Sequence, residues 1–184
     1  MVLADDWSRC VDQDDWRMQR ETFAELEARA GPFAVDLFAS DQNALLPIFY
    51  SILASEKAFA RDAFLQDWSA LGKVYACPPP KLVAATLRHF AGNAAQGGLI
   101  CPLWRSSPAW KFLASDGVHL NELVRSVKVV RPWITKGPDV ISNVFYGFTT
   151  FPFLSCEIDG SVPYPFRSRL HPDACMEGGC ANCL

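Results

Sequence analysis

Short apolar runs alternate with amphipathic stretches along the first two thirds of the chain. Over residues 21–30, apolar side chains recur at three- and four-residue spacing and Gly31-Pro32 follows, which predicts a helix that ends there. Residues 33–40 are an apolar run interrupted by Asp36, which is typical of a buried parallel strand with a ligand site at its carboxyl end.

Further strands and helices follow in alternation. Residues 45–52 form a second apolar run, in which Pro47 indicates an edge strand or an entry turn. A loop with one helical turn is expected over 62–68. Residues 73–77 predict another buried strand, stopped by three prolines, and 81–90 show helical periodicity.

The same alternation continues to about residue 115 and then stops. A strand is predicted over 99–104, introduced by Gly97-Gly98, and a short helix over 108–113. Strand-like runs without helices between them come next, so we expect an antiparallel end to the sheet; these runs are 127–130, 143–148 and 151–158.

This order predicts an α/β fold, an αβα sandwich around a mostly parallel sheet. A ligand site is expected where the strands at 33–40 and 73–77 end, because open parallel sheets bind ligands outside the carboxyl ends of their strands. On spacing alone, Asp36 could instead cap a helix and the prolines could simply terminate a strand. With 184 residues, half of them hydrophobic, the chain can bury one main core and carry an appendage.

Charge and targeting signals narrow the class of protein. A net charge of −3 gives no global attraction to nucleic acid, so any such binding must be local. No apolar stretch approaches the roughly 20 residues of a membrane span, and the acidic start does not resemble a signal peptide. We therefore expect an intracellular protein, nuclear or cytoplasmic, and we expect no disulfide framework from seven cysteines.

Five short motifs occur in an order that resembles the phage-type Dam DNA N6-adenine methyltransferase family, in the form found in DIRS-like tyrosine-recombinase retrotransposons. The resemblance covers roughly the first 115 residues. The motifs are Asp14-Asp15-Trp16, residues 31–40 with Asn43, Asp62-Ala63-Phe64 with Asp67-Trp68, residues 75–80, and residues 99–104 with Trp110.

The resemblance implies a Rossmann-like fold that uses S-adenosylmethionine (SAM), with DNA and other domains of an element-encoded polyprotein as partners. We expect the methyltransferase-like domain to span 14–160, after an extension at 1–13 and before a cysteine-rich tail at 161–184. The resemblance also implies that SAM lies against the first strand and a flipped adenine near the fourth. Four residues then match the cofactor pocket: Asp36, Phe38, Asn43 and Asp62.

The candidate catalytic segment departs from the family. Such enzymes carry Asn-Pro-Pro-Tyr or Asp-Pro-Pro-Tyr, whereas this chain has Cys77-Pro78-Pro79-Pro80. A thiol accepts hydrogen bonds weakly and proline has no aromatic face, so the contacts that polarise and stack the target base are both weakened, although the Pro78 carbonyl remains as an acceptor. The alternative is a catalytically inactive module of the same fold that binds nucleic acid or protein.

Two other roles for cysteines are open. One is that Cys77 acts as a nucleophile, like the cysteine of cytosine C5 methyltransferases, although that cysteine follows a proline whereas Cys77 precedes one. The alternative is that Cys77, at the end of a strand, is a small buried hydrophobe. Near the C-terminus, four residues have partial zinc-knuckle spacing, with Cys156 as a substitute for the histidine: His171, Cys175, Cys180 and Cys183. The alternative is a glycine-rich tail with incidental thiols.

A modest basic stretch follows the predicted pocket strands. It comprises Arg105, Lys111, Arg125, Lys128 and Arg131. This stretch is either a local surface that faces phosphates or an ordinary solvated face.

Overall fold

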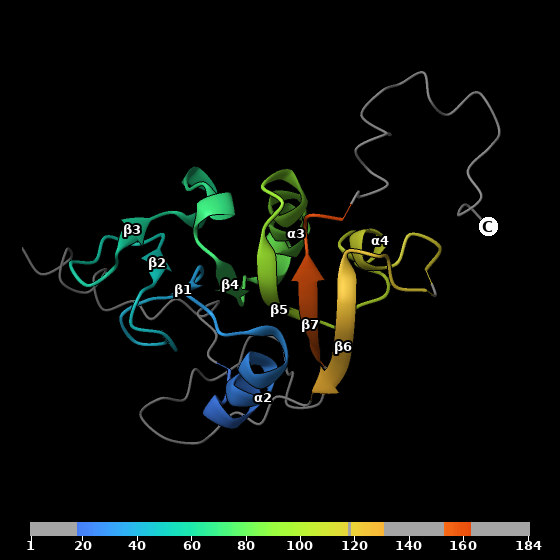
Figure 1. Cartoon of the computed structure of the whole chain (residues 1–184), viewed down its shortest axis with the longest axis horizontal. Coiled ribbons are helices and arrows are strands. Elements are labelled where there is room, and N and C mark those ends of the chain that lie inside the picture. The colour runs from blue at the N-terminus through green and yellow to red at the C-terminus, as the bar shows by residue number, and fades with distance from the viewer. Residues whose placement is uncertain (1–17, 118, 131–152, 163–184) are drawn as a thin grey trace, which may run out of the picture.

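The computed structural model describes residues 18–117, 119–130 and 153–162. Seven strands lie side by side in the order β3-β2-β1-β4-β5-β7-β6 (Figure 1). Their bounds are β1 (Val35–Asp36), β2 (Tyr50–Ser51), β3 (Ala60–Arg61), β4 (Lys73–Ala76), β5 (Gln96–Pro102), β6 (Val124–Val130) and β7 (Phe153–Asp159).

Two sheets meet at β1. Strands β1, β4 and β5 pair in parallel, whereas β7 pairs antiparallel with both β5 and β6. β2 and β3 form a two-stranded parallel sheet, and a parallel bridge between Asp36 and Phe49 places it beside β1. The predicted mostly parallel α/β fold with an antiparallel end is therefore confirmed, and it is consistent with a Rossmann-like methyltransferase fold.

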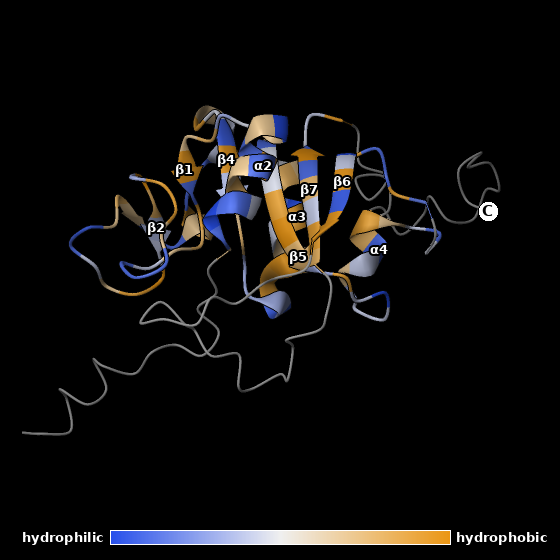
Figure 2. Ribbon diagram, turned by 90° about the horizontal axis from the view of Figure 1, so that it is seen from below, coloured by the Kyte–Doolittle hydropathy of each residue, from blue (hydrophilic) through white to orange (hydrophobic). Residues whose placement is uncertain are grey.

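Helices cover both faces of the five-stranded sheet. Figure 1 shows α2 (Arg20–Ala30) on one side and α3 (Val83–Gly92) with α4 (Trp110–Leu113) on the other. Side chains alternate between the faces, so Tyr75 packs with α2 while Val74 and Ala76 pack with α3. The hydrophobic residues accordingly concentrate in the central strands (Figure 2).

The three prolines after β4 determine where α3 starts. Proline lacks the N–H that a strand ladder or a helix interior needs. The chain therefore leaves the sheet after Ala76, passes through a 3-10 turn, η3 (Pro80–Leu82), and enters α3 at Val83. The predicted loop at 62–68 contains its one expected helical turn, η1 (Ala63–Leu65), and a second 3-10 turn, η2 (Trp68–Ala70), follows it.

The glycine pair belongs to a strand, not to a loop before it. A Cβ on Gly97 would lie 1.9 Å from the Val74 carbonyl oxygen, and one on Gly98 would lie 2.7 Å from the Phe33 ring and 2.8 Å from Leu26. The pair therefore permits close approach of β4 and α2 to β5.

Two strands are also shorter than the sequence predicts. The apolar run at 33–40 pairs in the sheet only over Val35–Asp36, and the run at 45–52 only over Tyr50–Ser51. The predicted strand at 143–148 lies outside the described residues. Within the described part of the chain, no helix is long and apolar enough to cross a membrane.

Candidate functional site

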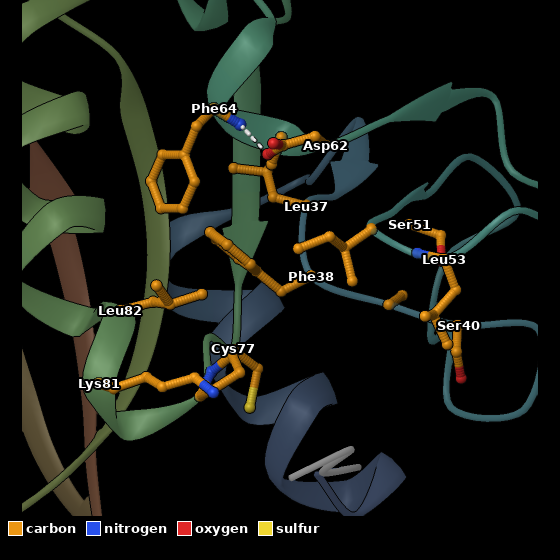
Figure 3. Close-up of a pocket in the computed structure, with 14 residues that line it drawn as sticks. Leu37, Phe38, Ser40, Ser51, Leu53, Asp62, Phe64, Cys77, Lys81 and Leu82 are labelled. Carbon is orange, nitrogen blue, oxygen red and sulfur yellow. Dashed lines mark hydrogen bonds between the residues drawn. The ribbon is translucent and has the colours of Figure 1, made fainter. Parts of the chain in front are cut away.

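A cavity of about 210 Å³ lies where β1 and β4 end. Its walls come from the segment after β1, the end of β2, the turn after β3 and the proline loop after β4 (Figure 3). This is the edge of the sheet where the sequence predicts a ligand site. Of the residues predicted for that site, four line the cavity: Phe38, Asp62, Cys77 and Pro79.

Asp62 is held in a strained turn at the cavity wall. Its φ of 50° lies in the left-handed region, which non-glycine residues seldom adopt. Its Oδ1 accepts a hydrogen bond from the Phe64 N–H at 3.0 Å and so caps η1. Its Oδ2 accepts no hydrogen bond from the described residues, so this oxygen is available to a ligand in the cavity.

Trp68 fixes that turn from behind. Its indole Nε1 donates to the Ala63 carbonyl at 2.8 Å, and its ring stacks on Phe64 with centroids 6.2 Å apart and an interplanar angle of 23°. Trp68 is fully buried, and its backbone N–H is bonded to Oδ1 of Asn93. The Asp62–Phe64 turn is thereby preorganised by the core.

Two half-buried phenylalanines form an aromatic wall. The Phe38 and Phe64 rings meet edge to face with centroids 5.4 Å apart, and both line the cavity. Leu82 lies beside them, and Leu53 lies opposite, on the side of Ser51 and Ser40 (Figure 3). An apolar slot with a carboxylate at its edge suits a ligand that has a flat apolar part and a polar or cationic part.

Asp36 and Asn43 are buried and do not line the cavity. Oδ2 of Asp36 accepts from the Leu45 N–H at 3.2 Å, and Oδ1 of Asn43 accepts from the Ser40 N–H at 2.6 Å. Both side chains therefore fold the segment that places Ser40 in the wall. Their predicted contact with a cofactor stays a prediction.

The four residues of the predicted catalytic segment separate in space. Cys77 and Pro79 line the cavity and Pro78 is buried, whereas Pro80 lines a neighbouring cavity of about 10 Å³ between Trp104 and Trp110. The catalytic role of this segment stays a prediction.

Tyr75 is buried on the α2 side of the sheet, near the proline loop. Burial raises the pKa of Tyr75 well above its usual value, and the nearby Cys77 and Asp36 act in the same direction. Further along the sheet, a hydrogen bond with Cys156 and burial raise the pKa of Cys101 well above its usual value. Tyr75 and Cys101 are therefore neutral, inert parts of the core at physiological pH.

A family model described as DNA N-6-adenine-methyltransferase (Dam) matches residues 8–95. The chain carries a DNA methyltransferase-like domain. The match contains every segment that lines the cavity and ends just before β5. Comparison with curated proteins gives no match.

Several residues in the cavity of this methyltransferase-like domain were not predicted from the sequence as site residues. They are Ser40, Ser51, Phe64 and Lys81. The position of Ser51 at the end of β2 and of Lys81 after the prolines could have indicated them, because strand ends meet at one edge of a parallel sheet. Lys81 extends toward Cys77 at one end of the cavity (Figure 3).

The predicted zinc site lies outside the described residues, except for its alternative ligand Cys156. Cys156 is fully buried in the core between β5 and β6. Among the residues that the structure describes, no group of three or more histidine, cysteine or acidic side chains could hold a metal ion. Zinc binding by His171, Cys175, Cys180 and Cys183 therefore stays a prediction.

Proposed function

We propose that the cavity binds SAM and that the domain is a SAM-dependent DNA methyltransferase-like module directed at the N6 of adenine. The observation that carries this proposal is the Asp62 carboxylate beside the aromatic wall of Phe38 and Phe64, at the carboxyl ends of β1 and β4. The family match over 8–95 supports it.

The chemistry of the cavity fits SAM. A carboxylate oxygen accepts hydrogen bonds from an amine or a hydroxyl and attracts a sulfonium, and aromatic faces contact a purine or a cation. Pockets that enclose a drug-sized ligand usually have about 300–1,000 Å³. A cavity of about 210 Å³ therefore encloses part of SAM, and the exposed rim at Ile52 and Leu53 would contact the rest.

The side chains around the cavity would bind and orient. Asp62 Oδ2 would accept a hydrogen bond from the cofactor, and Phe38 and Phe64 would exclude water from one of its faces. SAM supplies an electrophilic methyl group when bound. The proline loop from Cys77 to Pro79 would then face the target base, with the Pro78 carbonyl as the acceptor for its amine.

A second candidate is a module of the same fold that binds SAM without transferring its methyl group. The position of Pro80 favours it, because this residue replaces the family's aromatic ring and lines the neighbouring cavity rather than the main one. A thiol at Cys77 is also a weak acceptor for the target amine. Loss of preorganised polar stabilisation commonly lowers a rate by about 10²–10³.

Calorimetric titration with SAM and with S-adenosylhomocysteine (SAH) tests the proposal. We expect wild-type protein to bind both and Asp62→Asn to bind SAM about tenfold more weakly or worse, because a hydrogen bond to a charged group is lost. Asp67→Asn is the matched control: Asp67 also caps a 3-10 turn, through Ser69, but does not line the cavity. Absence of heat in the wild type, or equal effects of both variants, would refute SAM binding in this cavity.

Transfer of a labelled methyl group from SAM to unmodified adenine-containing DNA then separates the two candidates. Binding with transfer supports the enzyme, and binding without transfer supports the inactive module. We also propose an origin in a retroelement, on the likeness of residues 33–40 to the DIRS-like form of the domain. A coding sequence next to a tyrosine recombinase would support this origin.

A further inference from the structure

Charge is divided unevenly along the chain. Residues 18–67 contain eight acidic and four basic side chains, whereas residues 68–115 contain five basic side chains and no acidic one. Lys73 lies at the amino end of β4, where its Nζ donates to the Gly31 carbonyl at 3.1 Å. The other four lie on the proline loop, α3, the segment after β5 and α4: Lys81, Arg88, Arg105 and Lys111.

These four side chains, which we call the cationic face, are exposed and belong to the elements that cover the sheet opposite α2. The large exposed apolar side chains of the described residues lie elsewhere, around β2 and β3, at Leu65, at Leu120 and on β6. A cationic surface without exposed apolar side chains suits the phosphates of a nucleic acid better than the interior of a membrane or an apolar protein partner.

Aromatic rings, not carboxylates, hold the two arginines of the cationic face. The Arg88 guanidinium lies 5.3 Å from the centroid of Phe112, and that of Arg105 lies 5.8 Å from the centroid of Trp110. Neither arginine forms an ion pair with a described residue. A guanidinium stacked on a ring keeps most of its N–H donors for phosphate oxygens and is already positioned to use them.

The basic stretch predicted from the sequence therefore divides in two. Arg125 pairs with Asp159 at 2.9 Å and Lys128 pairs with Glu25, so acids already neutralise these two cations. Arg105 and Lys111 have no such partner among the described residues. Arg131 lies outside the described residues.

We propose that the cationic face binds the phosphate backbone of DNA and leads a strand to the cavity. Lys81 belongs to both the face and the cavity wall, so the two surfaces are continuous. The choice of DNA rests on the proposed function. Phosphate contacts of this kind position DNA without reading its sequence and weaken steeply with salt.

The test compares two triple variants that remove the same charge. In Arg88→Gln/Arg105→Gln/Lys111→Gln the cationic face loses three charges, while Lys81 stays because it belongs to the cavity. The control is Arg20→Gln/Lys57→Gln/Arg61→Gln, which removes three exposed cations from the acidic half. Fluorescence anisotropy with a labelled DNA duplex, at several salt concentrations, measures binding, and thermal unfolding checks that both variants fold.

We expect the first triple to bind DNA about tenfold more weakly or worse and its log–log salt slope to fall by about 2 to 3, whereas the control changes little. Equal losses in both triples, no duplex binding by the wild type, or preference for an RNA duplex would overturn the proposal. SAM calorimetry on the same proteins keeps the two proposals separate. SAM binding without DNA binding would refute the role of the cationic face alone, and DNA binding without SAM binding would refute the cofactor site alone.

Discussion

The Asp62 carboxylate and the Phe64 N–H are joined by a hydrogen bond of 3.0 Å, which orients the carboxylate at the cavity and fixes the backbone that carries the Phe64 ring (Figure 3). A polar and an aromatic side chain of the cavity wall thus come from a single turn of three residues. Because Trp68 holds the same turn through the Ala63 carbonyl, we expect ligand affinity and core packing to be coupled at this point.

Trp68→Phe tests that coupling. The variant keeps a ring in the core but removes the indole hydrogen bond to the Ala63 carbonyl, which still accepts from the Gln66 N–H at 3.2 Å, so we expect a loss of about 0.5–1.5 kcal/mol of unfolding free energy. We expect that loss together with several-fold weaker SAM binding, measured by urea unfolding and calorimetry. Trp110→Phe is the control, because its indole also donates to a backbone carbonyl, that of Gly117 at 3.1 Å, away from the cavity. If the control weakens SAM binding equally, the turn has no special role.

Cys77 should be the ligand-protected thiol among the three described cysteines. It lines the cavity, whereas Cys101 and Cys156 are almost fully buried and the pKa of Cys101 is raised. We expect iodoacetamide to modify Cys77 faster than the other two, and saturating SAH to slow that modification. Peptide mapping by mass spectrometry gives the rates at each site. A Cys77 rate that does not change with SAH would place the ligand elsewhere.

The free energy of unfolding at acid pH should depend on Asp159. Burial alone would raise its pKa, but hydrogen bonds from Ser161, Arg125 and Gln96 outweigh that effect and lower the pKa to about 2. A depressed carboxyl pKa stabilises the fold above the unfolded value near 4, and this contribution is lost as pH falls from about 4 to 2. Its size is at most about 2 kcal/mol, because solvent screens a carboxyl at the surface.

Asp159→Asn should therefore lower the free energy of unfolding at pH 7 and flatten its decline between about pH 4 and 2, as measured by urea titrations at each pH. Asp159 lies beside Gln96, at the edge of the sheet opposite the cavity, so SAM affinity should not change. A decline with pH that matches the wild type would show that other carboxylates control acid unfolding.

Gly98 should tolerate no larger side chain. A Cβ there would lie 2.7 Å from the Phe33 ring and 2.8 Å from Leu26, so Gly98→Ala must displace these two buried side chains. We expect a loss of about 1–3 kcal/mol in urea unfolding, the usual cost of overpacking a core. Gly92→Ala is the control, since no atom lies within 4 Å of its added Cβ. Similar stability of both variants would contradict the close packing of α2.

Periodicity predicted the helices at 21–30 and 81–90 and the strands around them, because these elements bury continuous apolar faces. It overestimated the length of the strands at 33–40 and 45–52. The residues after β1 and before β2 leave the sheet, and they form or support the wall of the cavity. Periodicity also started the strand at Leu99, after Gly97-Gly98, whereas β5 begins at Gln96, because a missing side chain gives the same pattern in a turn and at a close contact between strands.

The residues of the candidate site were harder to predict from the sequence than the helices and strands. Asp62 and Cys77 were predicted because they match motifs of the family that the sequence resembles. Ser51 and Lys81 match no motif, and only their places near strand ends could have indicated them, since their role depends on the parallel arrangement that brings the ends of β2 and β4 to one edge. The placement of Asp36 behind the wall depends on which face of β1 its side chain takes, and one residue of register reverses that choice.

The position of β5 in the sheet has a consequence for synthesis of the protein. β5 pairs with β4 on one side and along its whole length with β7 on the other, and a hydrogen bond of 2.6 Å joins Arg29 of α2 to the Ser155 carbonyl of β7. A nascent chain that has reached only residue 95 holds every wall of the cavity but lacks both strands. The ligand site is thus translated early, yet its scaffold can close only after residue 159 has left the ribosome.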